Sequence, residues 1–109
     1  MFKKNQSIPE TDVAQTATAR REGTAQIVHV REPDEWADGH MPGIVHIPLG
    51  DLAARLGELD PATPVIAVCR SGKRSLTAAD ILISGGFADA KSMAGGMTAW
   101  AESGEPVER

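Results

Sequence analysis

Short apolar runs alternate with segments of helical composition, and this alternation constrains the fold more than any other feature. The apolar runs predict strands, and the intervening patterns predict helices. Strands are expected at 25–30 (AQIVHV), 44–48, 65–68 (VIAV) and 90–94 (AKSMA), and helices at 10–21, 33–39, 51–59, 76–84 and 97–104. Such alternation indicates βαβ units. The chain is therefore predicted to be an α/β protein with a central, mostly parallel sheet and helices on both faces.

Helix ends are indicated by proline, glycine and serine. Pro33 is expected to be the first residue of a short helix and Gly39 its terminator, and Gly23 is expected to end the weakly helical segment before it. Ser75 is expected to cap the helix that follows the 65–68 strand, and Gly85 to end it. These signals set the expected helix limits.

The chain has 109 residues, of which 41% are hydrophobic and 24% charged. A chain of this length and composition supports one compact core. Residues 1–22 are interpreted as a polar tail and weak helix, and residues 23–109 as the folded domain.

Charge and hydropathy exclude several classes of function. The formal net charge is −4 and the sequence pI is about 5.3, whereas a nucleic-acid-binding domain usually carries a basic stripe. No apolar stretch approaches the roughly 20 residues that span a bilayer. The N-terminal lysines precede no apolar run, so no secretory signal is predicted. We expect a cytoplasmic protein with neither a nucleic-acid nor a membrane partner.

Cys69 is the only cysteine, so it has no internal disulfide partner and no second thiolate for a zinc site. The spacing of the three histidines, His29, His40 and His46, shows no helical ligand pair. No metal is expected, and Cys69 is expected to act as a lone thiol.

The surroundings of Cys69 predict an activated nucleophile. It follows the 65–68 strand, and sites in such sheets form at the carboxyl ends of strands. Positive neighbours and a helix N-terminus favour the thiolate. Arg70, Lys73 and Arg74 supply charge, and Gly72 allows the backbone to curl. An anion-binding loop around one sulfur atom is predicted, although an inert buried cysteine is an alternative.

Two reactions use such a loop: attack on a phosphate or arsenate ester, and attack on a sulfane sulfur donor to give a persulfide. A cysteine-dependent phosphatase signature has arginine six positions after the cysteine. Ser75 occupies that position and Arg74 comes one residue early. The loop length therefore favours sulfur transfer over phosphatase or arsenate reductase chemistry.

Three ordered motifs, VREPDEWADGHMPGIVHIPL, CRSGKRS and GGMTAW, resemble those of the rhodanese family of single-domain sulfurtransferases. The similarity runs from about Ile27 to Ala101. It implies a rhodanese-like three-layer fold and transfer of sulfur from thiosulfate or a related anionic donor, through a Cys69 persulfide, to cyanide or a thiol. It also implies no cofactor. The residues expected to bind substrate are Arg70, Ser71, Gly72, Lys73, Arg74 and Ser75.

The alternative within this family is a persulfide carrier or protein-binding module, which exchanges sulfur with a protein partner and reacts poorly with free thiosulfate. The family's first motif usually has aspartate where this chain has His29. His29 is therefore a candidate modulator that introduces a pH dependence near its ordinary pKa of about 6.5. The alternative is a hydrogen-bonded core histidine. His29→Asp is expected to change the transfer rate without abolishing transfer.

Overall fold

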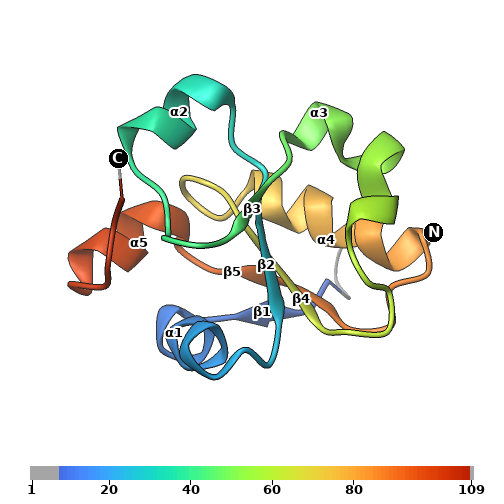
Figure 1. Cartoon of the computed structure of the whole chain (residues 1–109), viewed down its shortest axis with the longest axis horizontal. Coiled ribbons are helices and arrows are strands. Elements are labelled where there is room, and N and C mark those ends of the chain that lie inside the picture. Colours follow the sequence, from blue (N-terminus) through green and yellow to red (C-terminus); the bar gives the residue numbers. More distant parts are fainter. Residues whose placement is uncertain (1–7, 109) are drawn as a thin grey trace.

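The computed structural model describes residues 8–108, so the polar tail predicted at the N-terminus lies mostly outside the described part. Five strands form one sheet in the order β1-β5-β4-β2-β3, and each neighbouring pair is parallel. The strands are β1 (Glu10–Thr11), β2 (Gln26–His29), β3 (Val45–His46), β4 (Val65–Val68) and β5 (Ala90–Met93). The predicted parallel sheet is therefore confirmed (Figure 1).

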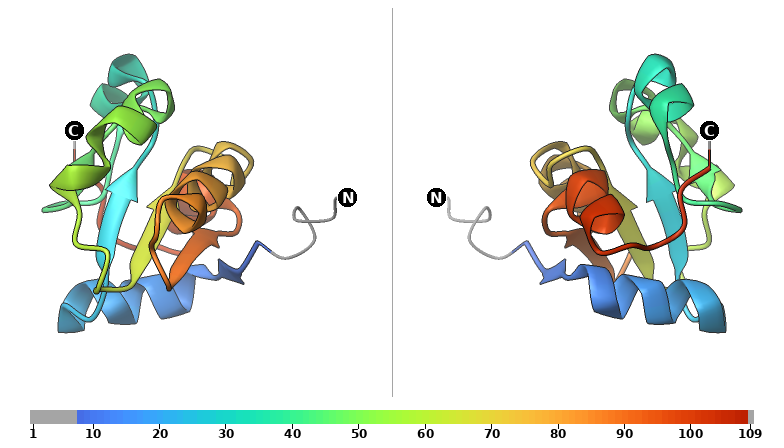
Figure 2. Two further views of the ribbon diagram at one scale, coloured as in Figure 1. Left: turned by 90° about the vertical axis from the view of Figure 1, so that its right-hand side faces the viewer. Right: turned by 90° about the vertical axis from the view of Figure 1, so that its left-hand side faces the viewer.

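The helices are α1 (Val13–Glu22), α2 (Pro33–Asp38), α3 (Leu49–Leu52), the 3₁₀ helix η2 (Ala53–Glu58), α4 (Arg74–Ser84) and α5 (Gly96–Glu102). Residues from α3, η2 and α4 pack with one face of the sheet, and residues from α1 and α5 pack with the other. The prediction of helices on both faces is thus confirmed. α2 and α3 lie at the end of the molecule opposite α1 (Figures 1 and 2).

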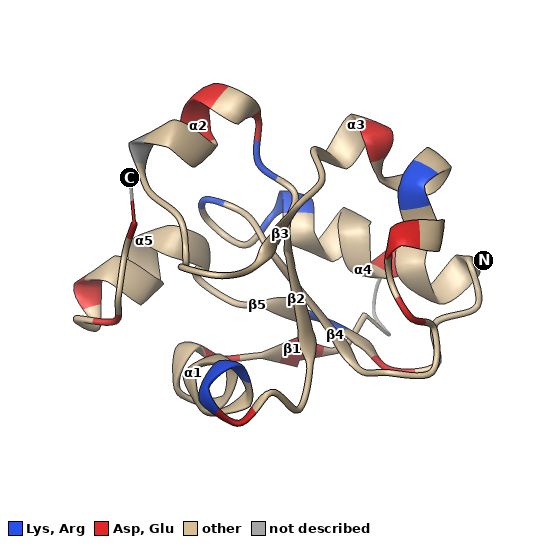
Figure 3. Ribbon diagram, viewed as in Figure 1, with Lys and Arg blue, Asp and Glu red and all other residues tan. Residues whose placement is uncertain are grey.

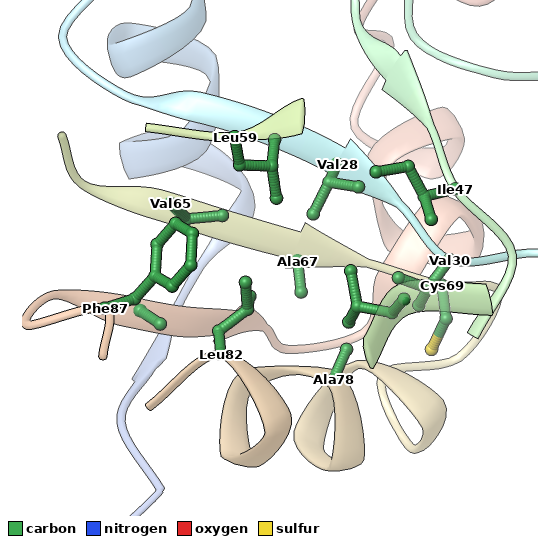
Figure 4. Close-up of a cluster of buried hydrophobic side chains, with 12 residues drawn as sticks. Val28, Val30, Ile47, Leu59, Val65, Ala67, Cys69, Ala78, Leu82 and Phe87 are labelled. Carbon is green, nitrogen blue, oxygen red and sulfur yellow. The ribbon is translucent and has the colours of Figure 1, made fainter. Parts of the chain in front are cut away.

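Strand β4 divides the core by alternation of its side chains. Val65 and Ala67 belong to the cluster beneath α4, and Ile66 and Val68 belong to the cluster beneath α1 and α5. Successive side chains in a strand point to opposite faces. Cys69 follows this period and falls in the α4 cluster, at the end of the row drawn in Figure 4.

The N-terminal part of the fold differs from the prediction. Glu10 and Thr11, expected in a helix, pair with β5 at the sheet edge. The helix starts after Asp12, whose carboxylate accepts a hydrogen bond from the Gln15 backbone N–H, and it ends at Gly23 with φ +68°, as predicted. A two-residue edge strand carries too little alternation to be read from the sequence.

Two helix predictions also need correction. The segment 51–59 is expected to be one helix, but α3 gives way to η2, and Arg55 leaves helical geometry at φ −117° and ψ 18°. The predicted cap Ser75 is instead the second residue of α4, whose N-cap is Lys73. The Ser75 side chain lies instead at the buried sulfur of Cys69, with Oγ 3.5 Å from Sγ.

Helix α2 follows the end of β2 and matches its prediction. It begins at Pro33 and is followed by Gly39. Beyond it, the backbones of His40 and Glu108 exchange two hydrogen bonds, which joins the chain after α5 to the chain after α2. In the part of the chain that the structure describes, every helix is too short or too polar to cross a bilayer.

Candidate active site

Cys69 lies at the carboxyl end of β4 and is 1% exposed. The chain then curls through residues 70–73 and enters α4 at Arg74. Gly72 makes this curl possible because its φ is +99°, a conformation that other residues rarely adopt. We call residues 69–75 the cysteine loop.

The Sγ atom of Cys69 is surrounded by hydrogen-bonding groups of its own loop. The backbone N–H groups of Gly72 and Ser75 donate to Sγ, with N to S distances of 3.1 and 3.3 Å. The thiol can donate to Ser75 Oγ at 3.5 Å, and Ser75 Oγ lies 2.6 Å from Ser92 Oγ. If Ser92 donates to Ser75, the Ser75 hydroxyl is free to donate to a thiolate.

These contacts control the ionisation of the thiol. Burial raises the pKa of Cys69, but the Ser75 hydroxyl and the backbone N–H groups of Ser75, Gly72 and Ser71 outweigh it, so the pKa lies below its ordinary value. Hydrogen bonds to a charged form favour that form. The loop therefore stabilises the nucleophilic thiolate.

Hydrogen bonds from the start of α5 hold the cysteine loop in place. The backbone N–H of Met97 donates to the carbonyl of Cys69 at 2.8 Å, and that of Thr98 donates to the carbonyl of Arg70 at 3.1 Å. Gly96 permits this approach, because a Cβ on it would lie 2.5 Å from the Cys69 carbonyl oxygen. Gly95 also lies beside the loop, since a Cβ on Gly72 would stand 3.0 Å from the Gly95 backbone nitrogen.

The three cations of the loop have different surroundings, and their predicted role in substrate binding stays a prediction. Arg70 and Lys73 are exposed, and they line separate hollows of about 150 and 280 Å³. Arg74 makes a two-pronged ion pair with Glu35 of α2, with both N to O distances 2.7 Å. Figure 3 shows basic residues of the loop below the acidic first turn of α2.

The Glu35–Arg74 pair shifts the titration of both partners. The Arg74 hydrogen bonds lower the pKa of Glu35 to about 2. Glu35 in turn raises the pKa of Arg74, and the charge of Cys69 adds to this increase. The sequence does not indicate Glu35 as a site residue, because no local signal connects two residues that are 39 positions apart.

His29 is fully buried in β2 and lies beside Val68 in the sheet register. Val68 belongs to the cluster beneath α1 and α5, so His29 faces away from the side on which Cys69 lies. Its ring nitrogens have no hydrogen-bond partner among the described residues. The expected hydrogen-bonded core histidine is therefore buried, but without the hydrogen bond.

Burial and, to a smaller extent, the charges of Arg31, His40 and His46 together lower the pKa of His29 to about 3. A pH dependence near 6.5 therefore does not follow from this environment. Whether His29 modulates sulfur transfer stays a prediction.

All three histidines contact Trp36 of α2. The His40 and His46 rings stack on the indole at centroid distances of 3.7 and 4.5 Å, and the His29 ring meets it edge-on at 5.4 Å. The imidazoles are also tied to backbone carbonyls, His40 Nδ1 to Trp36 and His46 Nε2 to Arg31, at 2.8 and 2.7 Å. These contacts fix α2 above the end of the sheet. Among residues 8–108, no group of three or more His, Cys, Asp or Glu side chains is placed to hold a metal ion.

Comparison with known proteins points to one family. The family model described as "Rhodanese-like domain" matches residues 12–103, a match that begins before the predicted domain boundary at residue 23. Thiosulfate sulfurtransferase GlpE of Pseudoalteromonas translucida is 37% identical over 98 residues, which cover 89% of this chain and 93% of that protein. "Putative sulfur carrier protein YrkF" of Bacillus subtilis is 36% identical over 95 residues.

The YrkF match covers 86% of this chain. This chain therefore corresponds to only about half (51%) of the length of YrkF. A crystal structure of a rhodanese-related protein from Thermoplasma volcanium superimposes with a TM-score of 0.83 at 25% identity, covering 92% of this chain and 97% of that one. The solved structure of a full-length protein from Lactobacillus plantarum gives a TM-score of 0.80 at 31% identity, covering 91% and 86%.

Proposed function

We propose that this chain, which belongs to the rhodanese-like domain family, is a sulfurtransferase that carries sulfane sulfur as a persulfide on Cys69. In the first step the Cys69 thiolate attacks the outer sulfur of thiosulfate. The S–S bond of the donor breaks, sulfite leaves with the bonding electron pair, and Cys69 becomes a persulfide anion. In the second step cyanide or a thiolate attacks the outer sulfur, which gives thiocyanate or a new persulfide and restores the Cys69 thiolate.

One observation supports this proposal above the others: the N–H groups of Gly72 and Ser75 both point at the sulfur of Cys69. Fixed donors of this kind stabilise negative charge in a partly buried site without reorganisation. The same donors would stabilise the thiolate before attack and the persulfide after it. Ser75 would thus stabilise the sulfur instead of capping the helix.

The remaining loop residues have expected roles in donor binding. Arg70 and Lys73 are exposed, and their charges would attract an anionic donor. Arg74 lies at the same loop with its guanidinium on Glu35. Ser71 contributes its backbone N–H to the Cys69 thiolate. This scheme requires no cofactor because sulfur is itself the transferred group.

A persulfide carrier that exchanges sulfur with a protein partner is the second candidate. The similarity to a relative that is named as a sulfur carrier favours it, and so does the engagement of Arg74 by Glu35, which leaves less charge for a small free anion. The two functions differ in the donor that loads Cys69. A cytoplasmic location is part of either proposal.

The test is the intact mass of the purified protein after thiosulfate and again after cyanide, with Cys69→Ser as the control. The proposal expects the wild type to gain the mass of one sulfur atom and cyanide to remove it, while Cys69→Ser stays unchanged. The two displacement steps also predict ping-pong kinetics. A gain from a protein persulfide but none from thiosulfate would support the carrier, and no gain from either donor would refute both.

A further inference from the structure

Arg74, the cation at the end of the cysteine loop, already forms an ion pair with a carboxylate. Arg74 is the first residue of α4, and its charge interacts with that of Cys69. Both terminal nitrogens of its guanidinium donate to the two oxygens of Glu35 at 2.7 Å. Such two-pronged pairing is the strongest geometry available to an arginine and a carboxylate.

Glu35 is held in this position by the packing of its neighbour. Trp36 stacks on the rings of His40 and His46, and Glu35 Oε1 also accepts a hydrogen bond from the Glu32 backbone N–H at 3.0 Å. The Glu35 and Arg74 side chains are 19% and 34% exposed, so the pair lies at the rim of the site and is only partly shielded from solvent. An incoming anion would meet the carboxylate together with the guanidinium.

The other two cations of the cysteine loop line hollows that do not include Arg74. Arg70 lines a hollow with residues of α5, whereas Lys73 lines a hollow with residues of α4. A donor with two negative charges would therefore find Arg74 neutralised by Glu35. The Glu35 carboxylate would also repel the second negative charge of such a donor.

We infer that Glu35 is a specificity-determining residue, which engages Arg74 and so disfavours dianionic sulfur donors relative to monoanionic ones. The inference rests on the proposed function, because it concerns which donor loads Cys69. It assigns Glu35 no part in the bond-making step. Its effect is expected in the KM for the donor.

The kinetic test compares two donors in the wild type and Glu35→Gln. Thiosulfate is a dianion that releases sulfite, and benzenethiosulfonate is a monoanion that releases benzenesulfinate; each leaves one sulfur on Cys69. Glu35→Gln removes a partly exposed negative charge that competes with the donor for Arg74. This change is expected to lower the KM for thiosulfate about fivefold. The KM for benzenethiosulfonate should change less than about twofold, because a donor with a single negative charge is repelled less by Glu35.

Asp34→Asn is the matched control, because it removes one negative charge from the same helix while an oxygen remains to accept the hydrogen bond from the Glu35 backbone N–H. This variant should leave the ratio of the two KM values unchanged. If Glu35→Gln raises the KM for thiosulfate, or lowers both KM values equally, the inference is wrong. Thermal unfolding of each variant checks that the fold is retained.

A binding experiment separates this inference from the proposed function. Cys69→Ser cannot form a persulfide, so titration of Cys69→Ser and of Cys69→Ser/Glu35→Gln with thiosulfate measures donor binding alone. The double variant is expected to bind about fivefold more tightly. Equal dissociation constants, or no measurable binding by either protein, would overturn the inference even if the wild type transfers sulfur. Conversely, tighter binding would support it even if no sulfur is transferred.

Discussion

Gly96 lies so close to Arg70 that a Cβ atom at position 96 would stand 2.4 Å from the Arg70 carbonyl oxygen. The φ of Gly96 is +58°, which is also unfavourable for other residues. This contact brings the first N–H groups of α5 to the carbonyls of the cysteine loop. The position of Cys69 therefore depends on a glycine 27 residues after it in the sequence.

Replacement of this glycine should disturb the site and the fold together. Gly96→Ala combines a positive φ with a backbone collision, and we expect it to lower the free energy of unfolding by about 3 kcal/mol. Urea unfolding measures this loss, and the fraction of persulfide in the intact mass should fall with it. Gly104→Ala is the matched control, since Gly104 has φ +81° but no atom within 4 Å of the position that a Cβ would take; its cost should be about 1 kcal/mol. Equal losses in the two variants would contradict the steric argument.

The Ser75 hydroxyl should determine part of the acidity of Cys69. Ser75→Ala removes one hydrogen bond to the thiolate and is expected to raise the pKa of Cys69 by about one unit. Alkylation by iodoacetamide as a function of pH measures this pKa without ambiguity, because the chain has a single cysteine. Ser84→Ala, at the exposed far end of α4, is the control. An unchanged alkylation profile in Ser75→Ala would show that the backbone N–H groups suffice.

His29 should make the protein less stable in mild acid. Its pKa is about 3 in the folded protein against an ordinary 6.5, so the unfolded chain takes up this proton first as the pH falls through 6.5. From pH 7 to pH 5 the free energy of unfolding should decrease by about 2 kcal/mol through this residue. Urea unfolding at both pH values measures the change.

His29→Leu should remove this part of the pH dependence while it leaves His40 and His46 in place. Glu35 does not complicate the interval, because its pKa is lowered from 4.5 to about 2 and its stabilising effect is lost only at lower pH. If wild type and His29→Leu show the same pH dependence between 7 and 5, His29 does not titrate as we expect.

Trp36 should hold α2 in place. Trp36→Ala removes the ring on which His40 and His46 stack, and we expect it to lower the free energy of unfolding by about 3 kcal/mol. Hydrogen exchange should become faster at the Trp36 backbone N–H, which donates to the Glu32 carbonyl. Trp36→Phe keeps an aromatic ring and should have a smaller effect. Unchanged exchange in Trp36→Ala would mean that the Glu35–Arg74 pair alone fixes the helix.

The sequence alone determined the order of most elements and the place of Cys69. The run 65–68 is predicted as a strand with its observed limits, and Pro33 and Gly23 mark helix ends correctly. These signals are local: alternation, β-branching, and the restricted backbone of proline and glycine act within a few residues. Because β4 ends at Val68, the sequence also placed Cys69 at the carboxyl edge of the sheet.

Only the tertiary structure decided what surrounds that sulfur. The sequence placed three cations next to Cys69, but only the structure shows that one of them, Arg74, meets Glu35 from a distant helix. Ser75 is a partner of the thiol and not the predicted cap, and His29 is buried without a hydrogen bond among the described residues. A strand, turn or helix end depends on neighbours along the chain, whereas the direction and partner of a side chain depend on packing between segments far apart in sequence. That packing exists only once the sheet and its helices have assembled.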